Sequence, residues 1–340
     1  MEYFQYQQPF TLENGQSLPE LTIAYHSYGE LNENKNNVIW ICHALTANSD
    51  VADWWPGMIG KGLLFDPEKD FIVCANILGS CYGSTGPLSI NPETGVPYFN
   101  SFPIVTIRDM VKAHMLLRQH LGITKIHLLI GGSIGGYQAL EWAVMEKEAI
   151  ENILLLTTSA AESAWGIAVH TAQRLAIEAD TTWKEPRADA GIKGMKAARA
   201  IGMLTYRNYE VLVEKQTDPD VNKIDNFKAS SYINHQGDKL VKRFNAYTYW
   251  MLTKAMDSHN IARGRADKLQ TVLKTIEHKT LIMGVSTDIL CPVKEQKFIS
   301  ENMPNADYIE ITSAYGHDGF LVEAEKITKH VRPWLAKKGS

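Results

Sequence analysis

The pentapeptide Gly131-Gly132-Ser133-Ile134-Gly135 constrains this chain more than any other segment because of the residues on its two sides. Before it, residues 125–130 form an apolar run of strand length, and after it residues 136–145 repeat apolar side chains along one helical face. A strand, a Gly-x-Ser-x-Gly turn and a helix are typical of a nucleophile elbow. Such a sharp turn needs glycine where a Cβ would clash, and it holds the serine hydroxyl above the strand end. We therefore predict that Ser133 is a catalytic nucleophile.

A serine nucleophile needs a base to take its proton and a carboxylate to orient that base. In folds with this elbow, the acid and then the histidine follow the serine along the chain. Residues 280–286 have the pattern of a buried strand, so Asp288 lies in the loop at its carboxyl end, where open parallel sheets bind ligands. His317 follows the next expected strand, 306–311, in a loop with glycines on both sides. We predict a catalytic triad of Ser133, Asp288 and His317.

The oxyanion that forms during acyl transfer needs two hydrogen-bond donors. One should be the backbone N–H of Ile134, directly after the nucleophile. The other should come from the loop after an earlier strand, here residues 38–43, which makes Leu45 or Thr46 the candidate. His43 precedes the elbow, so we interpret it as a residue that shapes this loop.

The order of apolar strands and helical segments along the chain predicts an α/β fold with a mostly parallel sheet covered by helices. Strand patterns stop after about residue 162 and resume at residue 280, with helical segments between them. We predict a core domain of residues 1–162 and 275–340, and an inserted helical lid of residues 163–274. A lid would protect an acyl-enzyme from water.

Two further segments have recognisable local patterns. Residues 10–19 and 21–28 resemble an antiparallel pair, with Asn14-Gly15 at the turn. Residues 79–103 form a long stretch rich in Gly, Pro, Ser and Asn, without helix or strand periodicity. A loop of that length is usually functional or disordered, and the placement of its Gly and Pro favours a rigid wall beside the site.

Several segments together resemble the homoserine O-acetyltransferase family, in the same order along nearly the whole chain. They are CHALT (42–46), NILGSCYGSTGP (76–87), NPETGVP (91–97), TIRDM (106–110), GGSIGG (131–136), QALEW (138–142), LTYR (204–207), QGD (236–238) and GHDGF (316–320). The resemblance implies an α/β-hydrolase fold and transfer of an acyl group from acyl-coenzyme A to the hydroxyl of L-homoserine, a step of methionine synthesis. Some members use succinyl-coenzyme A or acylate serine. The acyl choice stays open, because Ile134 stands where methionine is usual and Ala47 where glycine is frequent.

The resemblance also points to groups for the zwitterionic acceptor. Arg207 is our candidate for its carboxylate, because a guanidinium binds carboxylates in a bidentate manner. Asp318, next to His317, is our candidate for its ammonium. Both positions match family positions implicated in this role. The expected mechanism is ping-pong, with acetyl-coenzyme A as co-substrate and no other cofactor. No Gly-x-Gly-x-x-Gly or P-loop is present, so the sequence names no residue that binds coenzyme A.

Composition narrows the function classes further. The net charge is −4 and no long run of one sign occurs, which argues against nucleic-acid or anionic-membrane partners. The start of the chain has no signal-peptide pattern, and no apolar run is long enough for a membrane span, so we expect a cytoplasmic enzyme. The four cysteines show no metal-ligand spacing, so we expect free thiols and no metal site. A homodimer through the lid is also expected.

Three alternatives remain at this point. A serine esterase would share the triad, and a homoserine O-succinyltransferase or serine O-acetyltransferase would differ only in the shape of its pocket. A catalytically inactive binding module of the same fold is the alternative from another class, and the intact Ser133, Asp288 and His317 argue against it.

Overall fold

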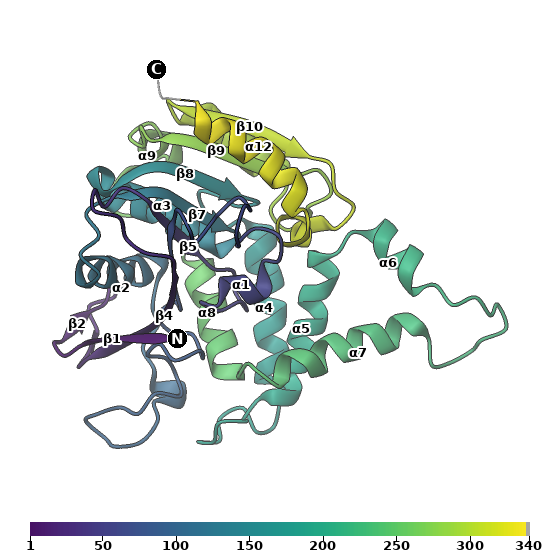
Figure 1. The fold of residues 1–340 in the computed structure, drawn as a ribbon. Helices are drawn as coiled ribbons and strands as arrows, with labels where there is room; N and C mark the ends of the chain where they lie inside the picture. Colours follow the sequence, from purple (N-terminus) through teal and green to yellow (C-terminus); the bar gives the residue numbers. More distant parts are fainter. Residues whose placement is uncertain (338–340) are drawn as a thin grey trace.

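The centre of the structure, a computed structural model that describes residues 1–337, is an eight-stranded sheet of order β1-β4-β6-β5-β7-β8-β9-β10 (Figure 1). The strands β6 to β10 run parallel with β5, whereas β4 is antiparallel to both of its neighbours, β1 and β6. The fold class predicted from the sequence is confirmed. The strand bounds are β1 (Glu2–Tyr6), β4 (Leu21–Tyr28), β5 (Val38–Cys42), β6 (Phe71–Ala75), β7 (Ile126–Gly132), β8 (Ile150–Leu156), β9 (Lys279–Val285) and β10 (Ala306–Ile311).

Both faces of the parallel part of the sheet are covered, which explains why β5 has five buried residues in a row. On one face, α2 (Ile107–His120) and α3 (Ile134–Met145) pack with side chains such as Trp40 into the larger core. On the other face, α12 (Ala324–Ala336) packs its apolar stripe against Ile39 and Ile41. Alternate residues of one strand therefore enter two separate cores. The short helices α1 (Val51–Trp54) and α11 (Gly319–Val322) also contribute to this second core or border it.

The N-terminal segment folds differently from the antiparallel pair that its pattern indicates. Residues Phe10–Thr11 (β2) and Ser17–Leu18 (β3) pair with each other, and the turn between them contains Gly15 at a φ of 85°. The next strand, β4, pairs instead with β1, with Glu2 opposite Tyr25. The turn was placed correctly, but the pairing was wrong because β4 buries its apolar side chains in the central sheet, which a local hairpin would not allow.

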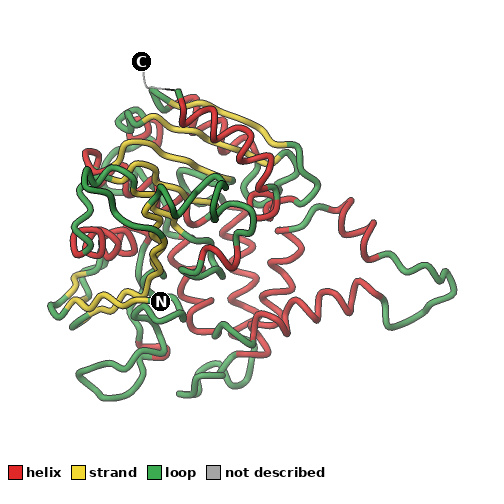
Figure 2. Tube along the Cα trace, viewed as in Figure 1, coloured by secondary structure: helices red, strands yellow, loops and turns green. Residues whose placement is uncertain are grey.

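Five longer helices lie between β8 and β9 and project from one side of the sheet (Figures 1 and 2). Within residues 163–274 the structure contains no strand, only one isolated bridge residue, Asn260, which pairs with Ala161. We call this segment the insertion; its division from the core as a lid remains a prediction. Its helices are α4 (Ala164–Glu178), α5 (Ile192–Tyr206), α6 (Tyr209–Gln216), α7 (Lys228–Val241), α8 (Ala246–Asp257) and the short α9 (Leu269–Leu273). The remaining helix of the core, α10 (Val293–Asn302), lies between β9 and β10.

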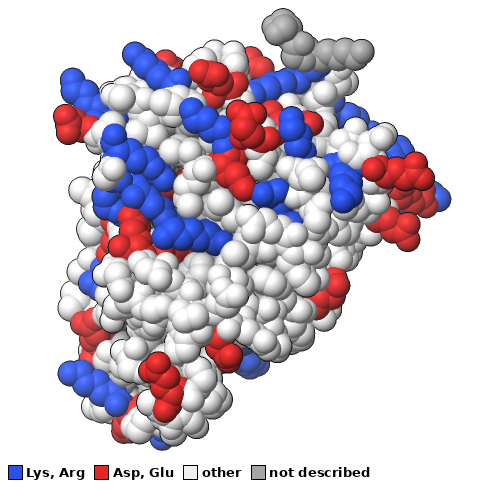
Figure 3. Space-filling view, turned by 90° about the vertical axis from the view of Figure 1, so that its left-hand side faces the viewer, with Lys and Arg blue, Asp and Glu red and all other residues white. Residues whose placement is uncertain are grey.

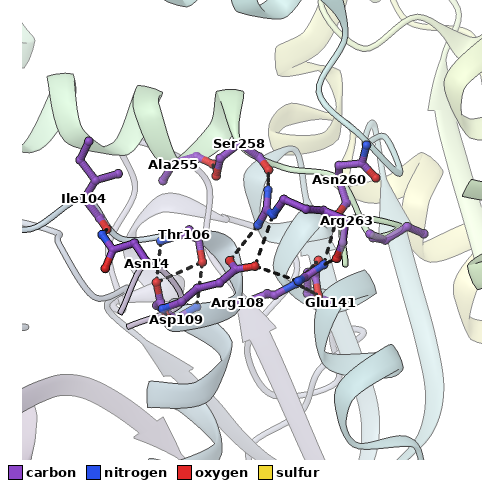
Figure 4. Close-up of polar contacts among 12 residues, drawn as sticks. Asn14, Ile104, Thr106, Arg108, Asp109, Glu141, Ala255, Ser258, Asn260 and Arg263 are labelled. Carbon is purple, nitrogen blue, oxygen red and sulfur yellow. Dashed lines mark hydrogen bonds and ion pairs between the residues drawn. The ribbon is translucent and has the colours of Figure 1, made fainter. Parts of the chain in front are cut away.

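A partly buried ionic network, with Glu141 fully buried at its centre, connects the end of the insertion to the core (Figure 4). Arg108 of α2 pairs with Glu13 at 2.8 Å and with Glu141 of α3 at 3.2 Å. Arg263 pairs with the same Glu13 at 2.8 Å, and Arg265 with Glu141 at 2.7 Å. Because each carboxylate meets two guanidinium groups, the charges that are taken from water compensate one another. The network therefore joins four segments that are distant in sequence.

Charges of both signs occur on the face of the molecule drawn in Figure 3. On the face drawn in Figure 3, Lys and Arg lie among Asp and Glu, and wide areas carry neither. Across residues 1–337, no helix combines the length and the apolar character that crossing a membrane would require.

Candidate active site

The elbow has the strained geometry that its glycines predict. Ser133 lies at a φ of 55° and a ψ of −126°, directly before α3, and is only 6% exposed. A Cβ on Gly131 would lie 2.0 Å from the carbonyl oxygen of Gly135, and a Cβ on Gly135 would lie 2.1 Å from that of Cys42. Only glycine fits at these two positions, so β7 can turn directly into α3 and present Ser133 at the carboxyl end of the sheet.

Asp288 and His317 form a buried hydrogen-bonded pair. The Nδ1 of His317 lies 2.7 Å from Oδ2 of Asp288, and the other oxygen of Asp288 accepts the backbone N–H groups of Leu290 and Cys291 at 2.8 and 2.9 Å. With Nδ1 donating to the carboxylate, Nε2 is free to act as a base. Burial by itself lowers the pKa of His317, but the charge of Asp288 and its hydrogen bond outweigh burial and raise that pKa above the ordinary histidine value.

Ser133 and His317 line one pocket of about 560 Å³. The core contributes the loop residues 44–48 and part of α1 to its wall. The insertion contributes another group of side chains: His170, Arg199, Tyr206, Lys239, Arg243 and Met256. The structure thus brings together the three side chains that the sequence assigns to the triad, although the described residues include no hydrogen bond between Ser133 and His317. No residue of the loop 79–103 lines this pocket, but the hydroxyl of Tyr82 in that loop accepts a hydrogen bond from Arg243, which does. That the loop forms a wall beside the site stays a prediction.

One predicted oxyanion donor lies in a loop that lines the same pocket, and the other directly follows Ser133. Leu45 and Thr46 line the pocket, and Ile134 is the first residue of α3, where a backbone N–H has no partner within its own helix. His43 is fully buried; its Nδ1 bonds the carbonyl of Ala44 at 2.8 Å, and its Nε2 accepts the N–H of Ile77 at 3.2 Å. Burial lowers the pKa of His43 to about 4, so the ring is neutral and holds the loop in place.

The two residues predicted to bind the acceptor pair with each other. Nε of Arg207 lies 3.3 Å from Oδ2 of Asp318. Asp318 lines the pocket with His317, whereas Arg207 lines a separate hollow between α6 and α7. Burial raises the pKa of Asp318 although Arg207, His317 and Arg199 all lower it. A carboxylate that is so costly to ionise would gain from a further cation in the pocket.

Arg199 is a pocket residue that the sequence analysis did not select. It lies on α5, seven residues before Tyr206, and its Cζ is 5.4 Å from the centre of the Tyr206 ring. Within the part of the chain that the structure describes, its guanidinium forms no ion pair, and its Nε is buried without a hydrogen-bond partner. Helical spacing places Arg199 and Tyr206 on one face of α5, but the sequence alone does not indicate that this face meets the pocket.

A second buried His–Asp pair also borders the pocket. Nδ1 of His170 on α4 lies 2.9 Å from Oδ1 of Asp257 at the end of α8, and Arg174 holds the other oxygen of Asp257 at 2.5 Å. Glu162 lies 4.0 Å from His170 and accepts a hydrogen bond from Tyr137 at 3.0 Å. His170 and Asp257 are 87 residues apart, so local patterns could not have connected them. This cluster fixes α4 against α8 on the pocket wall.

Metal ligands are not grouped in the described residues. No cluster of three or more His, Cys, Asp or Glu side chains that could hold a metal ion occurs within residues 1–337. All four cysteines, Cys42, Cys74, Cys81 and Cys291, are free thiols.

Comparisons with known proteins agree with this geometry. The family profile of the alpha/beta hydrolase fold matches residues 37–324. The homoserine O-acetyltransferase of Cyclobacterium marinum is 49% identical over 326 residues, which cover 96% of this chain and 92% of that protein. The homoserine O-acetyltransferase of Chlorobaculum parvum is 46% identical, over 94% of this chain and 90% of that protein.

Solved structures show the same relationship. The crystal structure of homoserine O-acetyltransferase from Bacillus anthracis matches with a TM-score of 0.93 and 26% identity, over 100% of this chain and 98% of that one. The crystal structure of esterase E22 matches with a TM-score of 0.86 and 23% identity, over 98% of this chain and 99% of that one. At the identity of the second match, the likeness concerns the fold alone.

Proposed function

The chain belongs to the homoserine O-acetyltransferase family of α/β hydrolases and is an acyltransferase, and from this premise we propose that it transfers the acetyl group of acetyl-coenzyme A to the side-chain hydroxyl of L-homoserine. The observation that carries the proposal is one pocket that holds Ser133, the paired His317, a cation at Arg199 and a carboxylate at Asp318. A nucleophile with its base suits acyl transfer, and opposite charges beside it suit a zwitterionic acceptor. The product would enter methionine synthesis.

In the first half-reaction, the Ser133 hydroxyl gives its proton to Nε2 of His317 and attacks the thioester carbonyl. Negative charge develops on the carbonyl oxygen, and the N–H groups of Ile134 and Leu45 stabilise it. His317 then returns the proton to the departing thiolate of coenzyme A. Asp288 keeps the imidazole in the required tautomer and stabilises the imidazolium that forms between these steps.

In the second half-reaction, His317 takes the proton of the homoserine hydroxyl, which attacks the acetyl-serine. The tetrahedral intermediate collapses, Ser133 leaves with the proton from His317, and O-acetylhomoserine is released. The same donors serve both oxyanions, because the reacting carbon stays attached to Ser133 Oγ in each.

The acceptor would be oriented by charges on two sides. Asp318 would bind its ammonium, as the sequence indicates. For its carboxylate the structure offers Arg199, which faces the pocket without an ion pair, in addition to the predicted Arg207, which Asp318 already engages. We propose that Arg199 binds the carboxylate and that Arg207 keeps Asp318 in position. The acceptor is thereby selected by Arg199 of the insertion together with Asp318 of the core, and residues of the core perform the chemistry.

Intact-mass spectrometry after incubation with acetyl-coenzyme A tests this function directly. We expect an adduct of one acetyl group on the wild-type chain, its loss on addition of L-homoserine, and no adduct on the Ser133→Ala variant. An adduct that forms only with succinyl-coenzyme A would show that the donor is succinyl-coenzyme A and not acetyl-coenzyme A. Loss of the acetyl group to water at the same rate with and without homoserine would favour an esterase. Absence of any adduct under single-turnover conditions would contradict the ping-pong scheme.

A further inference from the structure

Two cations on the insertion face the catalytic pocket without an anionic partner. Lys239 lies in the last turn of α7, and Arg243 lies in the turn that follows this helix. Both line the pocket with Ser133, and both are exposed, whereas Ser133 is buried. Among residues 1–337, no carboxylate lies within ion-pair distance of either one. They therefore lie on the exposed side of the pocket.

The Arg243 guanidinium is held in place by the core. Its Nη1 donates to the carbonyl oxygen of Thr46 and to the hydroxyl of Tyr82. Phe244 packs edge-on against the Tyr82 ring, with 5.9 Å between the ring centres, which fixes the segment further. The Nε and Nη2 groups donate to no residue that the structure describes. A guanidinium with one nitrogen anchored and others free is preorganised for an oxyanion such as a phosphate.

The charges around the pocket provide no counter-ion for Lys239 and Arg243. Three cations line the pocket, at Arg199, Lys239 and Arg243, against the carboxylates of Asp53 and Asp318. Asp318 is already paired with Arg207. A cleft with an excess of one sign raises the local concentration of ligands of the opposite sign.

We propose that Lys239 and Arg243 bind the phosphate groups of acyl-coenzyme A. This inference rests on the proposed function, and it identifies the residues that receive the nucleotide end of the donor. The thioester must reach the buried Ser133, so the phosphates lie toward the exposed side, where Lys239 and Arg243 are found. Arg199, beside Tyr206 and with its Nε buried, remains for the smaller carboxylate of the acceptor.

The decisive experiment compares donors with and without phosphates on the Lys239→Ala variant. With acetyl-coenzyme A, we expect the KM to rise about tenfold, because a charge-assisted contact to phosphate is lost. With S-acetyl-N-acetylcysteamine, which has the thioester but no phosphate, kcat/KM should equal that of the wild type. Lys242→Ala is the matched control, because Lys242 is an exposed neighbour of like charge that does not line the pocket. An equal loss with both donors, or the same loss in Lys242→Ala, would overturn the proposal.

Direct binding gives a second readout that does not depend on turnover. Calorimetric titration of free coenzyme A should show a Kd about tenfold higher for Lys239→Ala than for the wild type, and a smaller loss with 3′-dephospho-coenzyme A if Lys239 contacts the 3′-phosphate. Arg243→Lys, which keeps the charge but not the fork, should weaken coenzyme A binding less than Arg243→Ala. Unchanged affinity in Lys239→Ala would refute the subsite. If acetyl-coenzyme A does not acylate wild-type Ser133 at all, the proposed function fails instead, so the two failures are distinguishable.

Discussion

The insertion meets the core at two places. Its cations are paired with carboxylates at one of them and have no carboxylate partner at the other. At the end of the insertion, Arg263 and Arg265 share Glu13 and Glu141 with Arg108, so every charge in that partly buried cluster has a partner (Figure 4). At the pocket, Arg199, Lys239 and Arg243 face the cavity, and no carboxylate pairs with them in the described chain.

The difference separates structural charge from charge that is available to a ligand. A buried cation loses its hydration and must recover that energy from a partner. When the partner is another side chain, the gain is realised on folding and the pair holds segments together. At the pocket no side chain provides it: the Nε of Arg199 is buried without a partner, whereas Lys239 and Arg243 are exposed and keep their water, so all three stay available to a substrate. Removing a charge at the first place should therefore affect stability, and removing one at the second place should affect binding or turnover.

The largest effect should come from Asp288→Asn, which changes the one buried ion pair that belongs to the chemistry. We expect kcat to fall about a thousandfold or more, because the imidazolium loses its stabilising charge and its tautomer is no longer selected. The thermal midpoint should change little, because Asn retains the shape and can still accept the N–H groups of Leu290 and Cys291. Steady-state kinetics and a thermal melt check both parts. If Asp288→Asn instead lowers the melting temperature strongly and leaves turnover normal, Asp288 is a structural charge and not a catalytic one.

The pH dependence of the wild type tests the same role of Asp288. His317 must be neutral to accept the serine proton, and its pKa is raised above the ordinary value of about 6.5 by Asp288. The acid limb of kcat/KM for acetyl-coenzyme A should therefore lie above pH 6.5, with activity lost as the pH falls through it. In Asp288→Asn, burial acts without the opposing charge, so the limb of the residual activity should move to lower pH. A limb that stays in place would show that another group titrates.

Glu141→Gln should have the next largest effect, on stability. Glu141 is 1% exposed on its side chain and balances Arg108 and Arg265, so its loss leaves two guanidinium groups under-compensated. We expect the free energy of unfolding to fall by about 3 kcal/mol, while KM values measured well below the melting temperature stay unchanged. Chemical denaturation measures the first and initial rates the second. Glu185→Gln is the control, because its pair with Arg187 is half exposed and should contribute less than about 1 kcal/mol.

The smallest of these effects compares two arginines. Arg199→Ala should raise the KM for L-homoserine about 30-fold, which corresponds to a charged hydrogen bond of about 2 kcal/mol, and should leave acetyl-enzyme formation intact. Arg207→Ala should have a weaker effect on that KM, because it acts through Asp318. Titration of homoserine in the second half-reaction distinguishes them. If Arg207→Ala proves the more damaging, the carboxylate belongs to Arg207, as the sequence first indicated.

Much of the fold was predictable because its signals are local. Residues that are close in sequence are enough to indicate three features. These are the apolar runs of β5, β7 and β9, the Gly-x-Ser-x-Gly turn and the long helical stretch without strands. The pairing of β4 with β1 was not predictable in this way. Both the hairpin and the sheet satisfy the local pattern of residues 21–28, and only the burial of β4 against the rest of the sheet separates them.

For the candidate active site as well, some features follow from local sequence patterns and others only from tertiary structure. The sequence by itself predicted Ser133, Asp288 and His317 as a triad in this order, because the elbow and two strand-end loops require only short-range patterns. Tertiary structure alone decided that Arg199 faces the pocket and Arg207 faces Asp318, and that His170 meets Asp257 across the insertion. Helical periodicity places a side chain on a face of its helix, but the packing of whole helices against the sheet decides what that face contacts.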